Sequence, residues 1–192
     1  MGREFEIKYR LTPAALEALS QAFGPFETVS METTYYDSPD QALSGRKWTL
    51  RRRLENGISV CTLKTPSPDG GRGEWEVEAP NIEAALPSLI ALGAPNALLT
   101  LAKGLIPVCG AQFTRQKANI PWGSSQLELA LDRGKLLGGT RNAPIFEVEA
   151  EVKDGIDDDA LSFGAWLENE YGLVPEPKSK YTRARELARE GR

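Results

Sequence analysis

The sequence contains no histidine and only two cysteines. The absence of histidine excludes Ser-His-Asp triads, Cys-His pairs and histidine-ligated zinc sites. Cys61 and Cys109 are too few for a disulfide framework and too far apart in the sequence for a metal knuckle. A metal site in this chain must therefore use oxygen ligands, which favours Mg²⁺, Mn²⁺ or Ca²⁺.

Long apolar runs are also missing. No stretch of about 18 apolar residues occurs, and the chain begins with charged residues, Arg3 and Glu4, instead of an apolar signal sequence. We therefore expect a cytoplasmic protein with no membrane partner. The net charge of −4 likewise gives no reason to expect a nucleic-acid partner.

The composition is that of an ordinary globular chain, since 41% of the 192 residues are hydrophobic and 26% are charged. No linker-like stretch divides the chain. We expect a single domain over residues 1–192, and the sequence leaves a homodimer open.

Polar and apolar residues alternate in many segments with the period of two that is typical of β-strands. In the first segment Glu4, Glu6 and Lys8 share one face, while Phe5 and Ile7 share the other. The pattern predicts eight or so antiparallel strands. Besides residues 4–11, the expected strands cover residues 31–37, 48–54, 58–65, 72–79, 112–120, 126–132 and 145–152.

Turn and capping residues separate these segments. Thr12-Pro13, Asn81 and Ser179 are typical of helix starts, and Asn56-Gly57 predicts a tight hairpin. We expect an α+β fold with helices packed outside the strands. The expected helices cover residues 13–23, 82–92, 96–103 and 157–171 and continue from residue 180.

The charged face of the strands has two interpretations. It is either a solvated outer surface or the lining of a barrel interior. Charges of one sign repeat about 7 Å apart along single strands, which is repulsive unless counter-ions intervene. The opposite face carries large apolar residues such as Trp75, which amphipathic helices can cover. We therefore favour a charged interior, lined by basic Lys8, Arg10, Arg51, Arg53, Lys64, Arg72, Arg115 and Lys117 and by acidic Glu4, Glu6, Glu74, Glu76, Glu78, Glu128, Asp132, Glu147, Glu149 and Glu151.

Such an interior suits a ligand that is strongly anionic and bound to metal ions. Arginine and lysine bind phosphate oxygens, and carboxylates bind hard divalent cations. The two together predict a polyphosphate site, in which positioning and charge neutralisation supply most of the catalysis.

The motifs, taken in order, resemble the CYTH family, also called triphosphate tunnel metalloenzymes. The similarity spans residue 3 to about residue 187. It rests on Glu4-Phe5-Glu6-Ile7-Lys8, Tyr36-Asp37-Ser38-Pro39, Leu50-Arg51-Arg52-Arg53, Thr62-Leu63-Lys64, Arg72-Gly73-Glu74-Trp75-Glu76, Arg115, Leu131-Asp132, Glu147-x-Glu149-x-Glu151 and Ser179-Lys180-Tyr181.

This resemblance implies an eight-stranded antiparallel closed β-barrel, or tunnel, and dependence on Mg²⁺ or Mn²⁺. It implies metal ligands at Glu4, Glu6, Glu147 and Glu149. Phosphate contacts are implied at Lys8, Arg51, Arg53, Lys64, Arg72, Arg115 and Lys180. From the charged face we add Glu74, Glu76 and Asp132 as metal ligands and Lys117 as a substrate contact. One departure is Ala130, where some relatives place another acid.

The predicted function is metal-dependent hydrolysis of a triphosphate substrate, with Glu4, Glu6, Lys8 and Glu149 as catalytic residues. Inorganic tripolyphosphate is favoured because no element for recognising a base is evident. An adenylate cyclase of class IV type, making cyclic AMP from ATP, is the enzymatic alternative. A polyphosphate- or nucleotide-binding module without catalysis is the other, although the acidic positions are retained except at Ala130.

Overall fold

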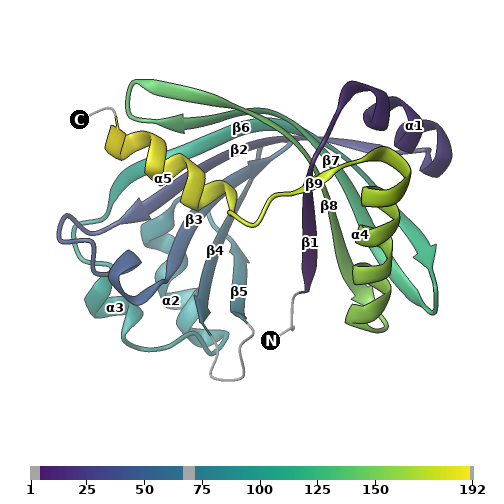
Figure 1. The fold of residues 1–192 in the computed structure, drawn as a ribbon. Helices are drawn as coiled ribbons and strands as arrows, with labels where there is room; N and C mark the ends of the chain where they lie inside the picture. Colours follow the sequence, from purple (N-terminus) through teal and green to yellow (C-terminus); the bar gives the residue numbers. More distant parts are fainter. Residues whose placement is uncertain (1–4, 67–71, 191–192) are drawn as a thin grey trace.

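The computed structural model describes residues 5–66 and 72–190, apart from the side chain of Arg72. Within these ranges, nine strands form one strongly curved antiparallel sheet with five α-helices around it (Figure 1). None of these helices is long and apolar enough to cross a membrane. The strands are β1 (Glu6–Arg10), β2 (Glu27–Asp37), β3 (Thr49–Glu55), β4 (Ile58–Pro66), β5 (Arg72–Glu78), β6 (Ile106–Trp122), β7 (Ser125–Gly138), β8 (Arg141–Asp154) and β9 (Val174–Pro175), and the helices are α1 (Pro13–Phe23), α2 (Ile82–Ala91), α3 (Leu98–Leu101), α4 (Asp157–Tyr171) and α5 (Lys180–Glu190).

The sheet does not close into a barrel. The strand order β5-β4-β3-β2-β6-β7-β8-β1-β9 leaves β5 at one edge and β9 at the other. No strand pairing joins these two edges in the described part of the chain. The antiparallel sheet with helices was expected, but the closed eight-stranded barrel was not found, because the sheet has nine strands and stays open.

The segment that contains β9 covers the edge of β1 that a closing strand would need. β9 pairs with Tyr9 and Arg10. One residue later, the N–H of Glu176 donates to the carbonyl of Lys8 at 2.8 Å. Pro175 has no N–H to donate, so it cannot extend the ladder to a further strand. β5 therefore has no free partner on this part of β1.

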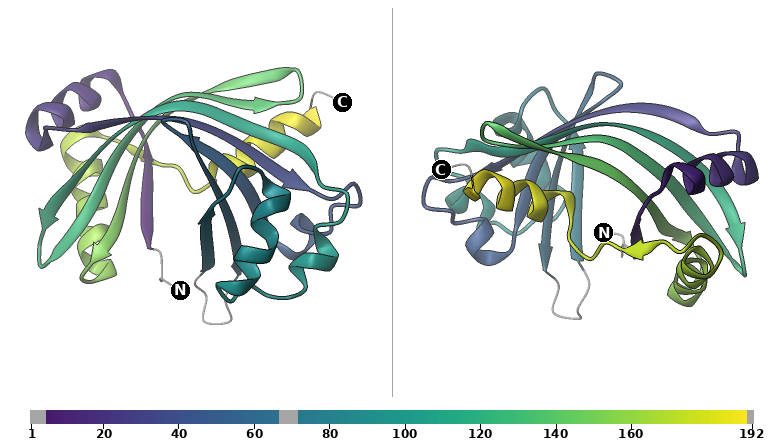
Figure 2. Two further views of the ribbon diagram at one scale, coloured as in Figure 1. Left: turned by 180° about the vertical axis from the view of Figure 1, so that it is seen from behind. Right: turned by 45° about the horizontal axis from the view of Figure 1, so that its top comes forward.

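Four helices cover the convex face of the sheet in two groups (Figure 2). Phe163 of α4 belongs to a buried cluster with Leu129 and Val148, to which α1 also contributes. Leu89 of α2 belongs to a second cluster with Trp75, to which α3 contributes. The apolar face of the strands therefore points outward to helices, and the charged face points inward.

Helix α5 lies instead on the concave face. Its Ala184 and Leu187 pack with Phe113 and Leu136, which point inward from β6 and β7. Lys180, in its first turn, borders the cavity inside the sheet. The expectation that all helices pack outside is therefore wrong for α5, because its apolar residues find their partners on the inner face.

Local signals in the sequence produced the expected caps and hairpin. Thr12 Oγ1 accepts a hydrogen bond from the N–H of Ala15 at 3.2 Å, and Asn81 caps α2 in the same way. Asn56 and Gly57 have positive φ angles of 49° and 89°, as a tight hairpin requires.

Several elements differ in length from their expected ranges. β2 begins at Glu27, and β6, β7 and β8 extend further at both hairpin ends. Some of the extra residues lie in the part of the sheet that α5 covers, since Val29 and Leu136 belong to the same buried cluster as Ala184. Helix α3 is only four residues long, and β9 was not expected.

Candidate functional site

A cavity of about 440 Å³ lies on the concave face, lined by side chains from every strand between β1 and β8 and by the start of α5. It brings together residues from both ends of the chain. The expected site residues that line it are Glu6, Lys8, Arg51, Arg53, Lys64, Glu74, Glu76, Arg115, Lys117, Glu149 and Lys180.

One side of the cavity is basic, formed by Arg51, Arg53 and Lys64; we call these residues the basic wall. They point inward because they alternate with outward-facing Leu50 and Leu63 on β3 and β4, both fully buried against helices. The Nε atoms of Arg51 and Arg53 are buried and have no hydrogen-bond partner among the described residues. These guanidinium groups therefore retain donors for an anionic ligand.

The charge balance of the basic wall is incomplete. Arg53 forms an ion pair with Glu55, and Lys64 Nζ lies 3.4 Å from Glu74 Oε2. Burial lowers the pKa of Arg53, and the nearby positive charge of Arg51 lowers it further. The neighbouring Glu76 accepts a hydrogen bond from Thr62 Oγ1 at 2.8 Å. Two close arginines in a buried position favour the binding of a multiply charged anion.

A row of carboxylates crosses the other side of the cavity. The pairing of β1, β8 and β7 places Glu6 opposite Glu151 and Glu151 opposite Glu128; we call these three residues the acidic rim. All three line the cavity. Lys153 Nζ is 2.8 Å from Glu151 Oε2, and Lys8 Nζ is 3.9 Å from Glu6 Oε1.

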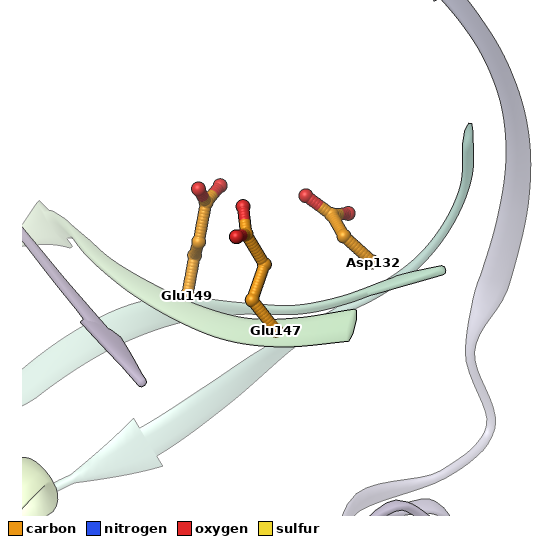
Figure 3. Close-up of side chains that lie close together, drawn as sticks. All are labelled: Asp132, Glu147 and Glu149. Atoms are coloured by element: carbon orange, nitrogen blue, oxygen red, sulfur yellow. The ribbon is translucent and has the colours of Figure 1, made fainter. Parts of the chain in front are cut away.

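A second group of acids lies deeper, beneath α5. One oxygen from each of Asp132, Glu147 and Glu149 lies within 4.8 Å of the others (Figure 3). We call these residues the buried carboxylate cluster. Lys180 Nζ is 2.7 Å from Asp132 Oδ2 and 2.8 Å from Glu149 Oε1, and it also pairs with Glu147.

Arginines complete the charge balance of this cluster. Arg115 donates from Nε and Nη2 to the two oxygens of Asp132 at 2.8 and 2.7 Å, and it also binds Glu149. Arg183 of α5 binds Glu147. Three positive side chains thus contact three carboxylates.

These contacts favour the charged forms of Glu149, Lys180 and Arg115. Burial alone would raise the pKa of Glu149, but Lys180, Arg115 and Lys8 outweigh it and hold that pKa well below its ordinary value. Burial alone would lower the pKa of Lys180, but Glu149, Asp132 and Glu147 hold it above the ordinary value. Arg115 is kept charged in the same way by Glu149 and Asp132.

The expected metal ligands fall into two groups, those that line the cavity and those that do not. Asp132 and Glu147 do not line it, and they are 0% and 1% exposed. Glu149 lies between this cluster and the cavity. Glu4 and the side chain of Arg72 lie outside the described residues. Lys117 lines the cavity and pairs with Glu27 at 3.6 Å.

Sequence reasoning did not assign roles to Glu128, Glu151, Lys153 or Tyr181, all of which line the cavity. The alternation along the two strands placed Glu128 and Glu151 on the charged face, so the sequence did contain a signal for both residues. Lys153 and Tyr181 were harder to find, because the first lies near a strand end and the second is placed by α5.

The sequence over residues 2–184 matches the CYTH domain family. The chain belongs to this family. A curated relative, the inorganic triphosphatase of Haemophilus influenzae, is 29% identical over 191 residues, which cover 95% of this chain and 54% of the relative. The chain therefore spans about half the length of that protein.

Solved structures share the CYTH fold. A Hippeastrum protein, described as an adenylyl cyclase with a dominant triphosphatase activity, has a TM-score of 0.64 and 19% identity, with coverage of 100% of this chain and 97% of that one. The PH1819 protein of Pyrococcus horikoshii has a TM-score of 0.61 and 24% identity, with coverage of 98% and 99%. This CYTH chain therefore shares its fold with these two proteins.

Proposed function

We propose that this CYTH chain hydrolyses the terminal phosphoanhydride of a triphosphate, with inorganic tripolyphosphate as the preferred substrate and Mg²⁺ or Mn²⁺ as the cofactor. The observation that carries the proposal is the pair of buried Nε donors on Arg51 and Arg53, which face a cavity with carboxylates on its other side. Guanidinium groups with unused donors match phosphate oxygens in both charge and geometry.

The carboxylates of the cavity fit a hard divalent cation. The acidic rim together with Glu149 offers only oxygen donors, and Glu6 is the most exposed of these side chains. Mg²⁺ and Mn²⁺ prefer such ligands. A bound divalent cation neutralises phosphate oxygens and lowers the pKa of a bound water. We assign this binding to Glu6 and Glu151, with Glu4 as a further ligand, and to Glu149, which would exchange its contact with Lys180 or Arg115 for one with the cation.

The chain's own residues position the substrate and balance its charge. The basic wall holds the phosphate chain, and Arg115 and Lys117 extend the positive surface along β6. Lys8 Nζ lies 3.6 Å from Glu149 Oε1, at the boundary between acids and phosphate. Because the pKa of Glu149 is held well below its ordinary value, Glu149 is a weak base and acts through its negative charge.

An apolar group at one end of the cavity favours an inorganic substrate over a nucleotide. Tyr35 and Phe113 are only 4% and 8% exposed, so their rings offer little free surface for stacking a base. Tyr181 of α5 packs on Tyr35 with ring centroids 5.0 Å apart. This packing covers part of the Tyr35 ring that could otherwise stack on a base. The activity of the Haemophilus relative also supports the assignment.

The test is a product assay with tripolyphosphate, pyrophosphate, ATP and thiamine triphosphate, each with Mg²⁺, with Mn²⁺ and with a chelator. We expect metal-dependent phosphate release that is fastest from tripolyphosphate. Cyclic AMP as the main product from ATP would favour the cyclase, and tight binding without turnover would favour a binding module. Faster hydrolysis of pyrophosphate would show that the site does not select a chain of three phosphates.

A further inference from the structure

The buried carboxylate cluster has the composition of a metal site, yet it already contains a cation. The Lys180 ammonium contacts an oxygen of each of Asp132, Glu147 and Glu149. An ammonium has three N–H donors, and here it faces three carboxylates. The Lys180 ammonium therefore occupies the position among the three carboxylates that a metal ion would take.

The charges of this region are also complete. Arg115 is bidentate on Asp132, and Arg183 binds Glu147. With Lys180, these give three positive side chains for three negative ones. A divalent cation that entered would have to displace a buried ammonium or guanidinium, and separating a buried ion pair is costly.

The exposure of the acids also argues against a divalent cation in this cluster. Glu147 and Asp132 are buried and do not line the cavity, because the first turns of α5 cover them. Glu6 and Glu151 lie on the open side, where a hydrated ion can reach them. Glu147 shares a strand face with Glu149 and Glu151, but it lies further under the helix.

We propose that Lys180 is the resident cation of the buried carboxylate cluster, and that Glu147 is a positioning residue for Lys180 and α5, not a ligand of a divalent metal ion. Glu147 holds two residues of α5, Lys180 and Arg183, so it sets where the helix lies over the cavity. Only the kinetic part of the test and the comparison with Glu6→Gln rest on the proposed function.

The first experiment measures Mn²⁺ binding to the intact chain by calorimetry and by electron paramagnetic resonance. We expect Glu147→Gln to keep the stoichiometry of the unsubstituted chain and its affinity within about twofold, whereas Glu6→Gln should weaken binding by at least about tenfold. A folded Glu147→Gln variant with tenfold weaker Mn²⁺ binding would overturn the proposal. If Glu6→Gln binds Mn²⁺ as tightly as the unsubstituted chain does, this result counts against the proposed metal site and does not affect the role of Glu147.

Hydrogen exchange separates positioning from a general structural role. Amides of α5 should exchange faster in Glu147→Gln. The matched control is Arg185→Ala, which removes contacts of α5 with Gln41 Oε1 at 3.0 Å, Ser44 Oγ at 3.4 Å and Asp37 Oδ2 at 3.8 Å without touching the cluster. In turnover of tripolyphosphate, Glu147→Gln should raise KM by about tenfold with a smaller change in kcat. Unchanged exchange in α5 would contradict the proposal.

A second variant covers the case in which Glu147→Gln does not fold. Lys180→Met keeps a long side chain but removes the ammonium, which leaves three carboxylates with too little positive charge. At pH 8 we expect this variant to bind one more Mn²⁺ per chain than the unsubstituted chain does, and its Tm to rise more strongly with Mn²⁺. The same number of bound ions and the same Tm response in both chains would show that Lys180 does not occupy a cation site.

Discussion

The two charged regions of the concave face differ in how far the chain satisfies them. In the buried carboxylate cluster, Lys180, Arg115 and Arg183 contact all three acids. In the basic wall, Arg51 and Arg53 keep buried Nε donors without a partner in the described part of the chain. Every acid of the first region pairs with a basic side chain, although the Nε of Arg183 is buried without a hydrogen-bond partner among the described residues there too; in the second region the two arginines with unpartnered Nε donors line the cavity.

This difference separates stability from binding. Buried charges that contact one another strongly resist the loss of either partner. In the basic wall, Glu55 and Glu74 pair with Arg53 and Lys64, and the unpartnered Nε donors of Arg51 and Arg53 are a cost to the folded chain that an anionic ligand can offset. We therefore expect substitutions in the cluster to act mainly on folding and those in the basic wall to act mainly on turnover.

The largest effect should come from Asp132→Ala. It leaves Arg115 and Lys180 without their shared carboxylate in a fully buried position. We expect a loss of about 3–5 kcal/mol in the free energy of unfolding, or roughly 6–20 °C in Tm for a chain of this size. Urea and thermal unfolding measure it. A loss below 1 kcal/mol would remove the distinction between the two regions.

Arg53→Ala should show the opposite pattern. It removes a charge-assisted contact with phosphate, which costs about 2–3 kcal/mol of transition-state stabilisation and lowers kcat/KM for tripolyphosphate roughly thirty- to a hundred-and-fifty-fold. The free energy of unfolding should change by less than about 1 kcal/mol, because the loss of the ion pair with Glu55 is offset by relief of the burial and of the repulsion from Arg51 that lower the pKa of Arg53. Arg53→Lys should recover only part of the activity.

Arg52→Ala is the matched control for that prediction. Arg52 is the neighbour of Arg53 on β3 but points to the other face, where its Nε donates to Ser59 Oγ at 2.8 Å. The kcat/KM of Arg52→Ala for tripolyphosphate should stay near that of the unsubstituted chain. Equal losses in both variants would show that the effect comes from the strand and not from the cavity.

A smaller effect concerns the apolar end of the cavity. Tyr181→Ala should remove the ring that packs on Tyr35 and open space beside the phosphates. We expect the ratio of kcat/KM for ATP to that for tripolyphosphate to rise about tenfold, while Tyr181→Phe keeps the original ratio. A parallel fall for both substrates would instead indicate a general loss of helix placement.

The smallest effect should come from an exposed ion pair between α5 and the segment that precedes it. Lys178 Nζ lies 2.9 Å from Glu186 Oε1, but both side chains are largely in solvent. Glu186→Ala should cost no more than about 1 kcal/mol in unfolding free energy and leave turnover unchanged. A loss as large as that of Asp132→Ala would show that burial does not govern the charges of this protein.

Strand parity predicted much of the site. Arg51 and Arg53 point into the cavity while Arg52 points away, as a period of two requires. The same rule could not distinguish Glu147 from Glu149, because both lie on one face of β8. Their difference lies in depth beneath α5, a helix that follows them by about thirty residues.

The sequence alone determined the elements and the two faces of the sheet, because capping residues, turn residues and alternation act over a few neighbouring positions. Only the tertiary structure decided whether the sheet closes and which acids face the cavity. Residues 174–176 use part of the edge of β1 that a closing strand would need. The exposure of the acids depends on where Lys180 and Arg183 bring α5 against β8. Both outcomes come from contacts between distant segments, and no local pattern encodes them.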